Sequence, residues 1–145
     1  VFLHFKQRRD HQNLLKKGKA FIEERNLRYK EFMERNKQLI PSEKIQNMIL
    51  KCTSLRQLQD GLERKTFSSV DLVMHYAYRC QSYGMQLNLI TQTNFEFALE
   101  LAEKFDRLRT NKSAFYEYKK GTSEDGLFIG IPISFKDHLY LKGTK

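Results

Sequence analysis

Residues 6–37 contain no proline and a single glycine, Gly18, so they favour one long helix over any other local structure. Apolar residues recur along this stretch at helical spacing, at Leu15, Ile22, Tyr29 and Phe32. Because they make only a narrow stripe, the predicted helix is mostly solvated. Pro41 ends it, and Ser42 is placed to cap the helix that follows.

The positive charge of the chain is concentrated in the same region. Residues 1–40 hold eleven lysines and arginines against five acids, a net +6 out of +9 for all 145 residues. Such a basic segment indicates an acidic partner, either lipid head groups or nucleic acid. The simpler alternative is a solvated helix that packs on its own domain. We therefore expect a basic helical extension, residues 1–40, before a folded part, residues 41–145.

Short helices are predicted in the first half of the folded part. One spans residues 43–51, and the next has Thr53 as its N-cap and ends near Gly61. That second helix carries an apolar row made by Leu55, Leu58 and Leu62. A third helix opens with a capping box of Ser68 and Asp71 and ends at Gly84.

The chain changes character after residue 84. Residues 87–91 alternate between apolar and polar types, which predicts a short strand. Asn94 can cap a further helix, and residues 110–126 have the composition of an exposed loop.

Residues 128–135 are almost continuously apolar, as a strand covered on both faces requires. Lys136 and Asp137 end this run abruptly. Desolvation disfavours the ammonium form, so a buried lysine has a lowered pKa and acts as a base near neutral pH. The ordinary alternative is that the strand simply ends at solvent.

Neither the cysteines nor the histidines form a pattern with chemistry of its own. Cys52 and Cys80 have no metal-ligand spacing and make no disulfide framework, so we expect free thiols in a reducing compartment. The histidines are scattered at positions 4, 11, 75 and 138. We expect no metal site and no cofactor.

The segment that ends in Lys136 resembles the G-[IV]-P-[IV]-x-x-K-[DE] … K-G segment of the amidase-signature family. It reads Gly130-Ile131-Pro132-Ile133-Ser134-Phe135-Lys136-Asp137, followed by Lys142-Gly143-Thr144. Upstream, residues 55–73 resemble that family's leading helices, residues 87–90 its next strand, and residues 98–106 its A-x-x-x-A-x-x-x-D helix. In order and spacing the resemblance covers residues 50–145, about two thirds of the chain.

The resemblance implies an α/β fold, in which this chain supplies the N-terminal part of a mixed sheet flanked by helices. It also implies a Ser–cis-Ser–Lys relay for amide hydrolysis through an acyl-enzyme, with Lys136 as the catalytic lysine. The family's glycine- and serine-rich segment, with the nucleophile, the bridging serine and the oxyanion-hole amides, is absent here. Asp137 is expected to be structural, and His138 has no role in such a relay.

No serine of this chain sits in the context of a nucleophile, including Ser113, Ser123 and Ser134. Both ends of the chain look cut, since it begins at Val1 and stops within the K-G-T motif. We therefore expect the isolated chain to be inactive, for want of a nucleophile, and poorly soluble, for want of strand neighbours for residues 128–135.

Two branches of the family compete, and they differ in substrate and location. Residues 134–143 and the basic extension look closer to the fatty-acid-amide-hydrolase-like branch. That branch implies a lipid amide substrate and an intracellular, membrane-associated enzyme with residues 1–40 against the cytoplasmic leaflet. The alternative is a soluble amidase, or the A subunit of a glutamyl-tRNA amidotransferase, with a small-molecule amide as substrate.

Readings without catalysis also stay open. The parent protein is then an inactive amidase relative, or residues 6–37 form a basic binding helix. Nucleic acid is disfavoured as its partner, because acids are interleaved with the bases and no aromatic platform is present. A homodimer is left open.

Overall fold

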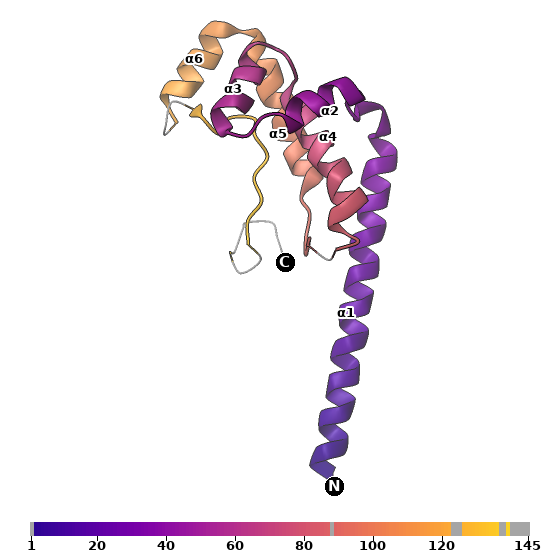
Figure 1. Ribbon diagram of the computed structural model, residues 1–145. Coiled ribbons are helices and arrows are strands. Elements are labelled where there is room, and N and C mark those ends of the chain that lie inside the picture. The colour runs from indigo at the N-terminus through magenta and orange to yellow at the C-terminus, as the bar shows by residue number, and fades with distance from the viewer. Residues whose placement is uncertain (1, 88, 123–125, 137–138, 140–145) are drawn as a thin grey trace.

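The computed structural model describes residues 2–87, 89–122, 126–136 and 139, with side chains from residue 10 onward in those ranges. Helices dominate it (Figure 1): Phe2–Arg35 (α1), Glu43–Leu50 (α2), Leu55–Glu63 (α3), Ser69–Arg79 (α4), Phe95–Thr110 (α5) and Lys112–Lys120 (α6). A 3-10 turn, Lys37–Leu39, follows α1. A π-helical turn, Cys80–Gly84, extends α4 as far as the predicted end of that helix.

The described residues contain no strand, so the predicted α/β fold with a mixed sheet is wrong. Within the predicted strand 87–91, the described residues are turn, coil and bend. The run 128–135 starts as a turn and continues as unpaired coil. A strand needs a hydrogen-bonded neighbour, whereas an apolar run specifies only a buried environment.

Helix α6 replaces most of the predicted loop at 110–126, which was also wrong. The Asn111 side chain caps this helix by accepting a hydrogen bond from the Ala114 N–H at 3.1 Å. Tyr118 of α6 meets Phe105 of α5 edge to face, with ring centroids 5.8 Å apart. Aromatic packing on α5 thus stabilises a segment whose composition resembles that of a loop.

The helix starts test the capping predictions one by one. The capping box of Ser68 and Asp71 is confirmed, with both reciprocal hydrogen bonds present. Ser54, not Thr53, is the N-cap of α3, and its side chain accepts from the Gln57 N–H. Ser42 and Asn94 stand at N-cap positions, but their side chains make no capping hydrogen bond.

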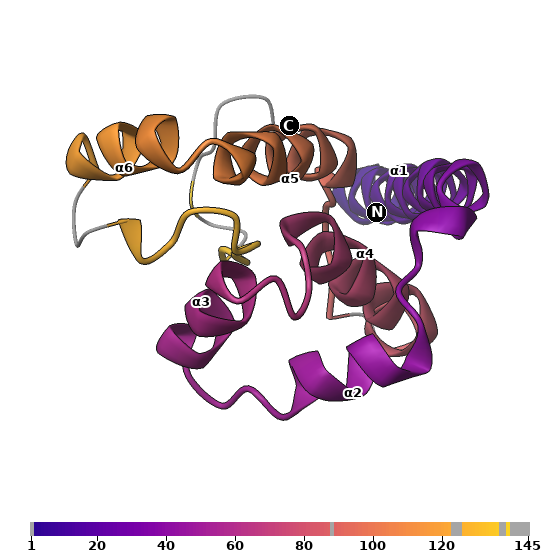
Figure 2. The same ribbon diagram turned by 90° about the horizontal axis from the view of Figure 1, so that it is seen from above.

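Two groups of buried side chains form the core. The larger group joins the end of α1 to α4 and α5, and consists of Tyr29, Phe32, Met33, Val73, Met74, Ala77, Leu99 and Ala102. The smaller group joins α2, α3 and α4, and consists of Ile49, Leu58, Leu62, Phe67 and Leu72, with Ile131 packed against it. Seen from above, α5 and α6 follow one another along one side, while α2, α3 and α4 make up the other (Figure 2).

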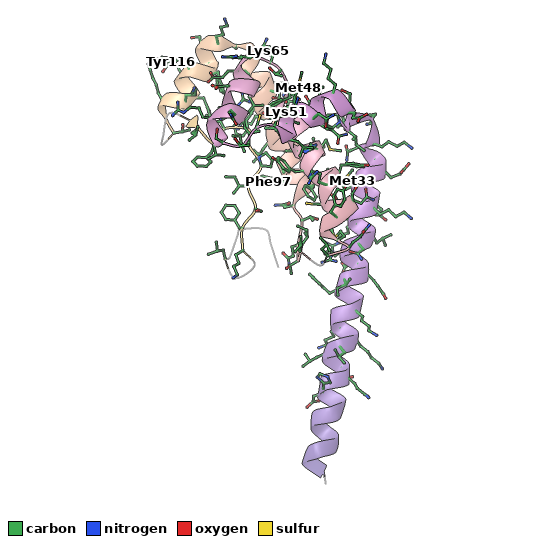
Figure 3. All side chains as sticks on the ribbon, viewed as in Figure 1. Met33, Met48, Lys51, Lys65, Phe97 and Tyr116 are labelled. Carbon is green, nitrogen blue, oxygen red and sulfur yellow. The ribbon has the colours of Figure 1, made fainter. Side chains whose placement is uncertain are left out.

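The long predicted helix is confirmed, and most of it stands clear of the body (Figure 1). Its 34 residues span about 51 Å at 1.5 Å per residue. Only its last turns enter the core, and the side chains lower down project into open space around the helix (Figure 3). From residue 10 to residue 25, the large apolar side chains are exposed, and they continue the face that carries Tyr29 and Phe32: Leu14, Leu15, Phe21 and Ile22.

Candidate active site

The segment that leads to Lys136 begins in a tight turn at residues 126–131. Gly126 and Gly130 have positive φ angles of 73° and 79°, a region that glycine adopts at little cost. Within the turn, the Ile129 N–H donates to the Gly126 carbonyl at 3.0 Å and the Ile131 N–H to the Phe128 carbonyl at 3.2 Å. The side chain of Ile129 is buried, so this turn is anchored on the helices.

Gln59 of α3 is the first anchor of the turn. Its amide nitrogen lies 2.6 Å from the Leu127 carbonyl oxygen and 3.2 Å from those of Gly126 and Ile129. Gln59 is only 7% exposed, so water does not compete freely for these carbonyls. The Gln59 side chain therefore replaces the backbone hydrogen-bond donors that a neighbouring strand would have offered to this segment.

Arg109 of α5 is the second anchor. Its guanidinium donates to the Ile129 carbonyl at 2.6 Å and to the Ser69 hydroxyl at 2.8 Å. The Asp106 carboxylate lies 3.7 Å from the same guanidinium and accepts from the N–H groups of Ser69 and Val70 at 2.8 and 3.0 Å. A carboxylate at the first turn of α4 also interacts favourably with the helix dipole.

We call Gln59, Ser69, Asp106 and Arg109 the Arg109 cluster. Burial lowers the pKa of Arg109 from its ordinary value, and the Asp106 carboxylate opposes this effect. The Arg109 side chain is 8% exposed, and its Nε has no hydrogen-bond partner among the described residues. The guanidinium stays charged in any case, and its two donating arms fix the geometry.

Lys136 lies at the end of the coil that leaves this turn. The residues from Ile133 to Lys136 are exposed, so nothing in the described part of the chain buries the lysine. Ser134, two residues earlier, is exposed as well, and Ser113 lies on the exposed surface of α6. Asp137, His138 and Ser123 fall outside the described residues. The structure thus brings no serine hydroxyl into contact with Lys136 within the described ranges.

The remaining reactive side chains are spread over other parts of the fold. Cys52 and Cys80 are free thiols, as predicted, and each is half-buried. His75 of α4 is fully buried, with neither ring nitrogen hydrogen-bonded. No group of three or more histidine, cysteine, aspartate or glutamate residues in the described ranges is arranged to hold a metal ion.

A shallow hollow of about 410 Å³ lies beside the turn, between α3 and Lys119 of α6. Gln59, Gly126 and Leu127 line it together with charged side chains of α3. Lys136 does not line this hollow, so the candidate base and this depression are separate features.

Sequence reasoning missed Gln59 and Arg109. Gln59 follows Leu58 inside the leucine row of α3, and a polar residue next to such a row is a signal that could have marked it. Arg109 is placed three residues after Asp106, the spacing of neighbours on a helix face. Neither spacing reveals the carbonyl groups that these side chains reach.

Comparison with known proteins identifies relatives of one kind. The chain is 36% identical over 91 residues to a protein of Moraxella catarrhalis, covering 63% of this chain and 16% of the relative. It is 32% identical over 92 residues to one of Acinetobacter baylyi, and 32% identical over 93 residues to one of Alcanivorax borkumensis. All three bear the name of the glutamyl-tRNA(Gln) amidotransferase A subunit. The chain therefore has amidase-signature homologues.

The similarity covers only a small part of each relative. The chain spans 16% to 18% of the length of these three relatives, so the comparison concerns a part of such a protein. The shared name supports the amidotransferase alternative better than the predicted fatty-acid-amide-hydrolase-like branch, which the comparison does not support. No family model matches the chain, and no solved structure matches it.

Proposed function

We propose that this chain is the N-terminal part of an amidase-signature enzyme that hydrolyses linear amides, with Lys136 as its base. The observation that carries the proposal is the similarity to amidotransferase A subunits over 91 residues. The sequence around Lys136 also supports it, since it resembles the family's lysine motif. In this proposal, residues 41–145 open the catalytic domain and residues 1–40 precede it.

The chemistry requires groups that this chain does not supply. In such a relay the lysine contacts the bridging serine whose proton it takes. Lys136 is exposed in the described part, so the proposal places the rest of the enzyme over it, with the bridging and nucleophilic serines. The described chain alone is then inactive, because it has neither nucleophile nor oxyanion hole.

Of the two substrate classes, the comparisons favour a small carboxamide over a fatty acid amide. The first candidate is therefore an amidotransferase-type or soluble amidase activity that releases ammonia from an amide such as that of glutamine. A fatty acid amide remains the second substrate to assay, because it was the main expectation from residues 134–143.

The test is amide turnover by the full-length protein that contains this chain. Ammonia release from glutamine and from oleamide is measured for wild type, Lys136→Ala and Lys104→Ala. Lys104 lies exposed on α5, so its replacement controls for the loss of a surface charge. Turnover that falls by about 10³-fold or more in Lys136→Ala alone is expected, by analogy with other catalytic groups. Equal turnover in the three proteins would remove Lys136 from the mechanism.

We also propose that α1 binds an anionic membrane surface. Leu14, Leu15, Phe21 and Ile22 are between 39% and 67% exposed and share one face of the helix. Residues 6–19 carry six basic side chains and one acid, a net +5. An apolar face on a basic helix fits the boundary of an anionic bilayer, with about 1 kcal/mol of attraction per Lys or Arg near the surface.

This arrangement differs from a membrane-spanning one. Along the described residues, no helix is both long and apolar enough to cross a bilayer. The proposal is therefore a helix that lies on the surface of the membrane.

Vesicle flotation tests the membrane proposal with the full-length protein. Wild type, Leu15→Glu/Ile22→Glu and Leu27→Glu are mixed with phosphatidylserine-containing or purely phosphatidylcholine vesicles. Leu27 is 57% exposed on the opposite side of α1, so its replacement is the matched control. Binding to anionic vesicles that the double variant loses and the control keeps is expected. Equal flotation of all three, or binding only to added RNA, would overturn the proposal.

A further inference from the structure

The turn and the helices approach each other more closely at Gly130 than a side chain would permit. A Cβ atom at this position would lie 2.3 Å from the Ser69 hydroxyl oxygen and 2.8 Å from an Arg109 guanidinium nitrogen. The positive φ of 79° would strain any other residue as well. Gly130, the first residue of the motif that ends in Lys136, therefore fits directly against the Arg109 cluster.

The Arg109 cluster is itself held in a fixed orientation. Asp106 joins α5 to the first turn of α4 through two backbone N–H groups, and Ser69 is fully buried. Phe115 of α6 packs under the Arg109 guanidinium, whose central carbon lies 5.0 Å from the ring centroid. Residues of α4, α5 and α6 thus orient Arg109. Its second terminal nitrogen, which does not contact Ser69, donates to the Ile129 carbonyl.

Beyond the turn, the described chain offers little else to direct the segment. Ile131 packs against the smaller core group, but residues 133–136 are exposed coil. Among the described residues, the last side-chain hydrogen bonds before Lys136 are those of Gln59 and Arg109 to the Ile129 carbonyl. The Arg109 cluster therefore fixes the backbone direction with which the five residues from Ile131 to Phe135 begin.

We infer that Arg109 and Gln59 are positioning residues for Lys136, acting through the backbone at Ile129 and Gly130. The inference rests on the proposed role of Lys136 as a base. Reacting groups must be held within a fraction of an ångström, and small displacements lower rates about 100-fold. If the turn rotates, the segment that follows it moves and displaces Lys136. If these residues only contributed packing, their loss would lower stability without displacing the lysine.

The test is the pH dependence of fluorophosphonate labelling in the full-length protein. Labelling rates of wild type, Arg109→Met, Ser69→Ala and Arg107→Met are measured from pH 5 to 10, with thermal unfolding recorded in parallel. Arg107 is on the same helix with a 72% exposed side chain, so it is the matched control. Ser69→Ala removes only the hydroxyl that Arg109 holds, and it serves if Arg109→Met fails to fold.

A displaced Lys136 no longer lies where proton transfer from the bridging serine requires it. We therefore expect Arg109→Met to label about 10-fold or more slowly across the pH range. Ser69→Ala is expected to slow labelling by a smaller factor, and Arg107→Met to match wild type. Profiles that overlay wild type, with only the unfolding temperature lowered, would show a purely structural role and overturn the inference. Absence of labelling in wild type would instead refute the proposed function.

Discussion

At the scale of single residues, each buried polar group lowers the stability of the fold unless hydrogen bonds offset its desolvation. Arg109 satisfies two of its nitrogens with a carbonyl and a hydroxyl, so its desolvation is offset by charge-assisted hydrogen bonds. His75 has no such partners, although it is fully buried between the helices. A neutral imidazole without hydrogen bonds is tolerable there, whereas an imidazolium is not. Acid therefore destabilises the fold at His75, whereas Arg109 keeps the same charge.

His75 makes the stability of the chain depend on pH. Burial, with a smaller contribution from Arg79, lowers the pKa of His75 below its ordinary value of 6.5. The unfolded state then binds more protons, so the contribution is fully present above about pH 6.5 and declines as the pH falls toward the folded-state pKa. Thermal unfolding between pH 5 and 8 should show His75→Phe losing less stability in acid than wild type. Parallel pH profiles for the two proteins would contradict this explanation.

At the scale of elements, the residues at the helix ends help to determine where each helix begins. The N-cap positions of α2 to α6 all carry serine or asparagine, and the sequence had marked or nearly marked four of them: Ser42, Ser54, Ser68 and Asn94. The fifth, Asn111, lies in the segment that was predicted to be a loop. Only some of these side chains hydrogen-bond to the helix, and those bonds distinguish a cap that stabilises from a residue that merely stands at the boundary.

Ser68 and Ser42 provide a matched pair for this distinction. The Ser68 hydroxyl accepts from the Asp71 N–H at 3.0 Å, while Ser42 makes no side-chain capping bond. Ser68→Ala should lower the free energy of unfolding by about 1 kcal/mol, and Ser42→Ala by clearly less. Urea denaturation of the two variants and wild type gives both values. Equal losses would show that hydrogen bonding at the cap is not what stabilises α4.

At the scale of the whole molecule, the sequence predicted what depends on nearby residues and failed where distant ones decide. The long α1 helix and the capping box at Ser68 follow from local spacing, and both are confirmed. The strand at 128–135 was wrong because a strand requires a neighbour that the described chain does not contain.

The candidate site divides in the same way. Lys136 came from a motif of eight consecutive residues, which a sequence displays directly. Its anchors involve Gln59 and Arg109, which reach Ile129 from 70 and 20 residues away. No pattern in the sequence specifies that approach, because it arises from the packing of α3, α4 and α5 around the turn.

We propose Lys136 as the base of a serine amidase. The most direct measurement is the mass of the full-length protein after exposure to a fluorophosphonate, for wild type and Lys136→Ala at pH 8. Wild type is expected to form one covalent adduct, on a serine outside residues 1–145, and Lys136→Ala is expected to form it far more slowly. Equal rates of adduct formation in both proteins, or an adduct on a serine of this chain, would contradict it.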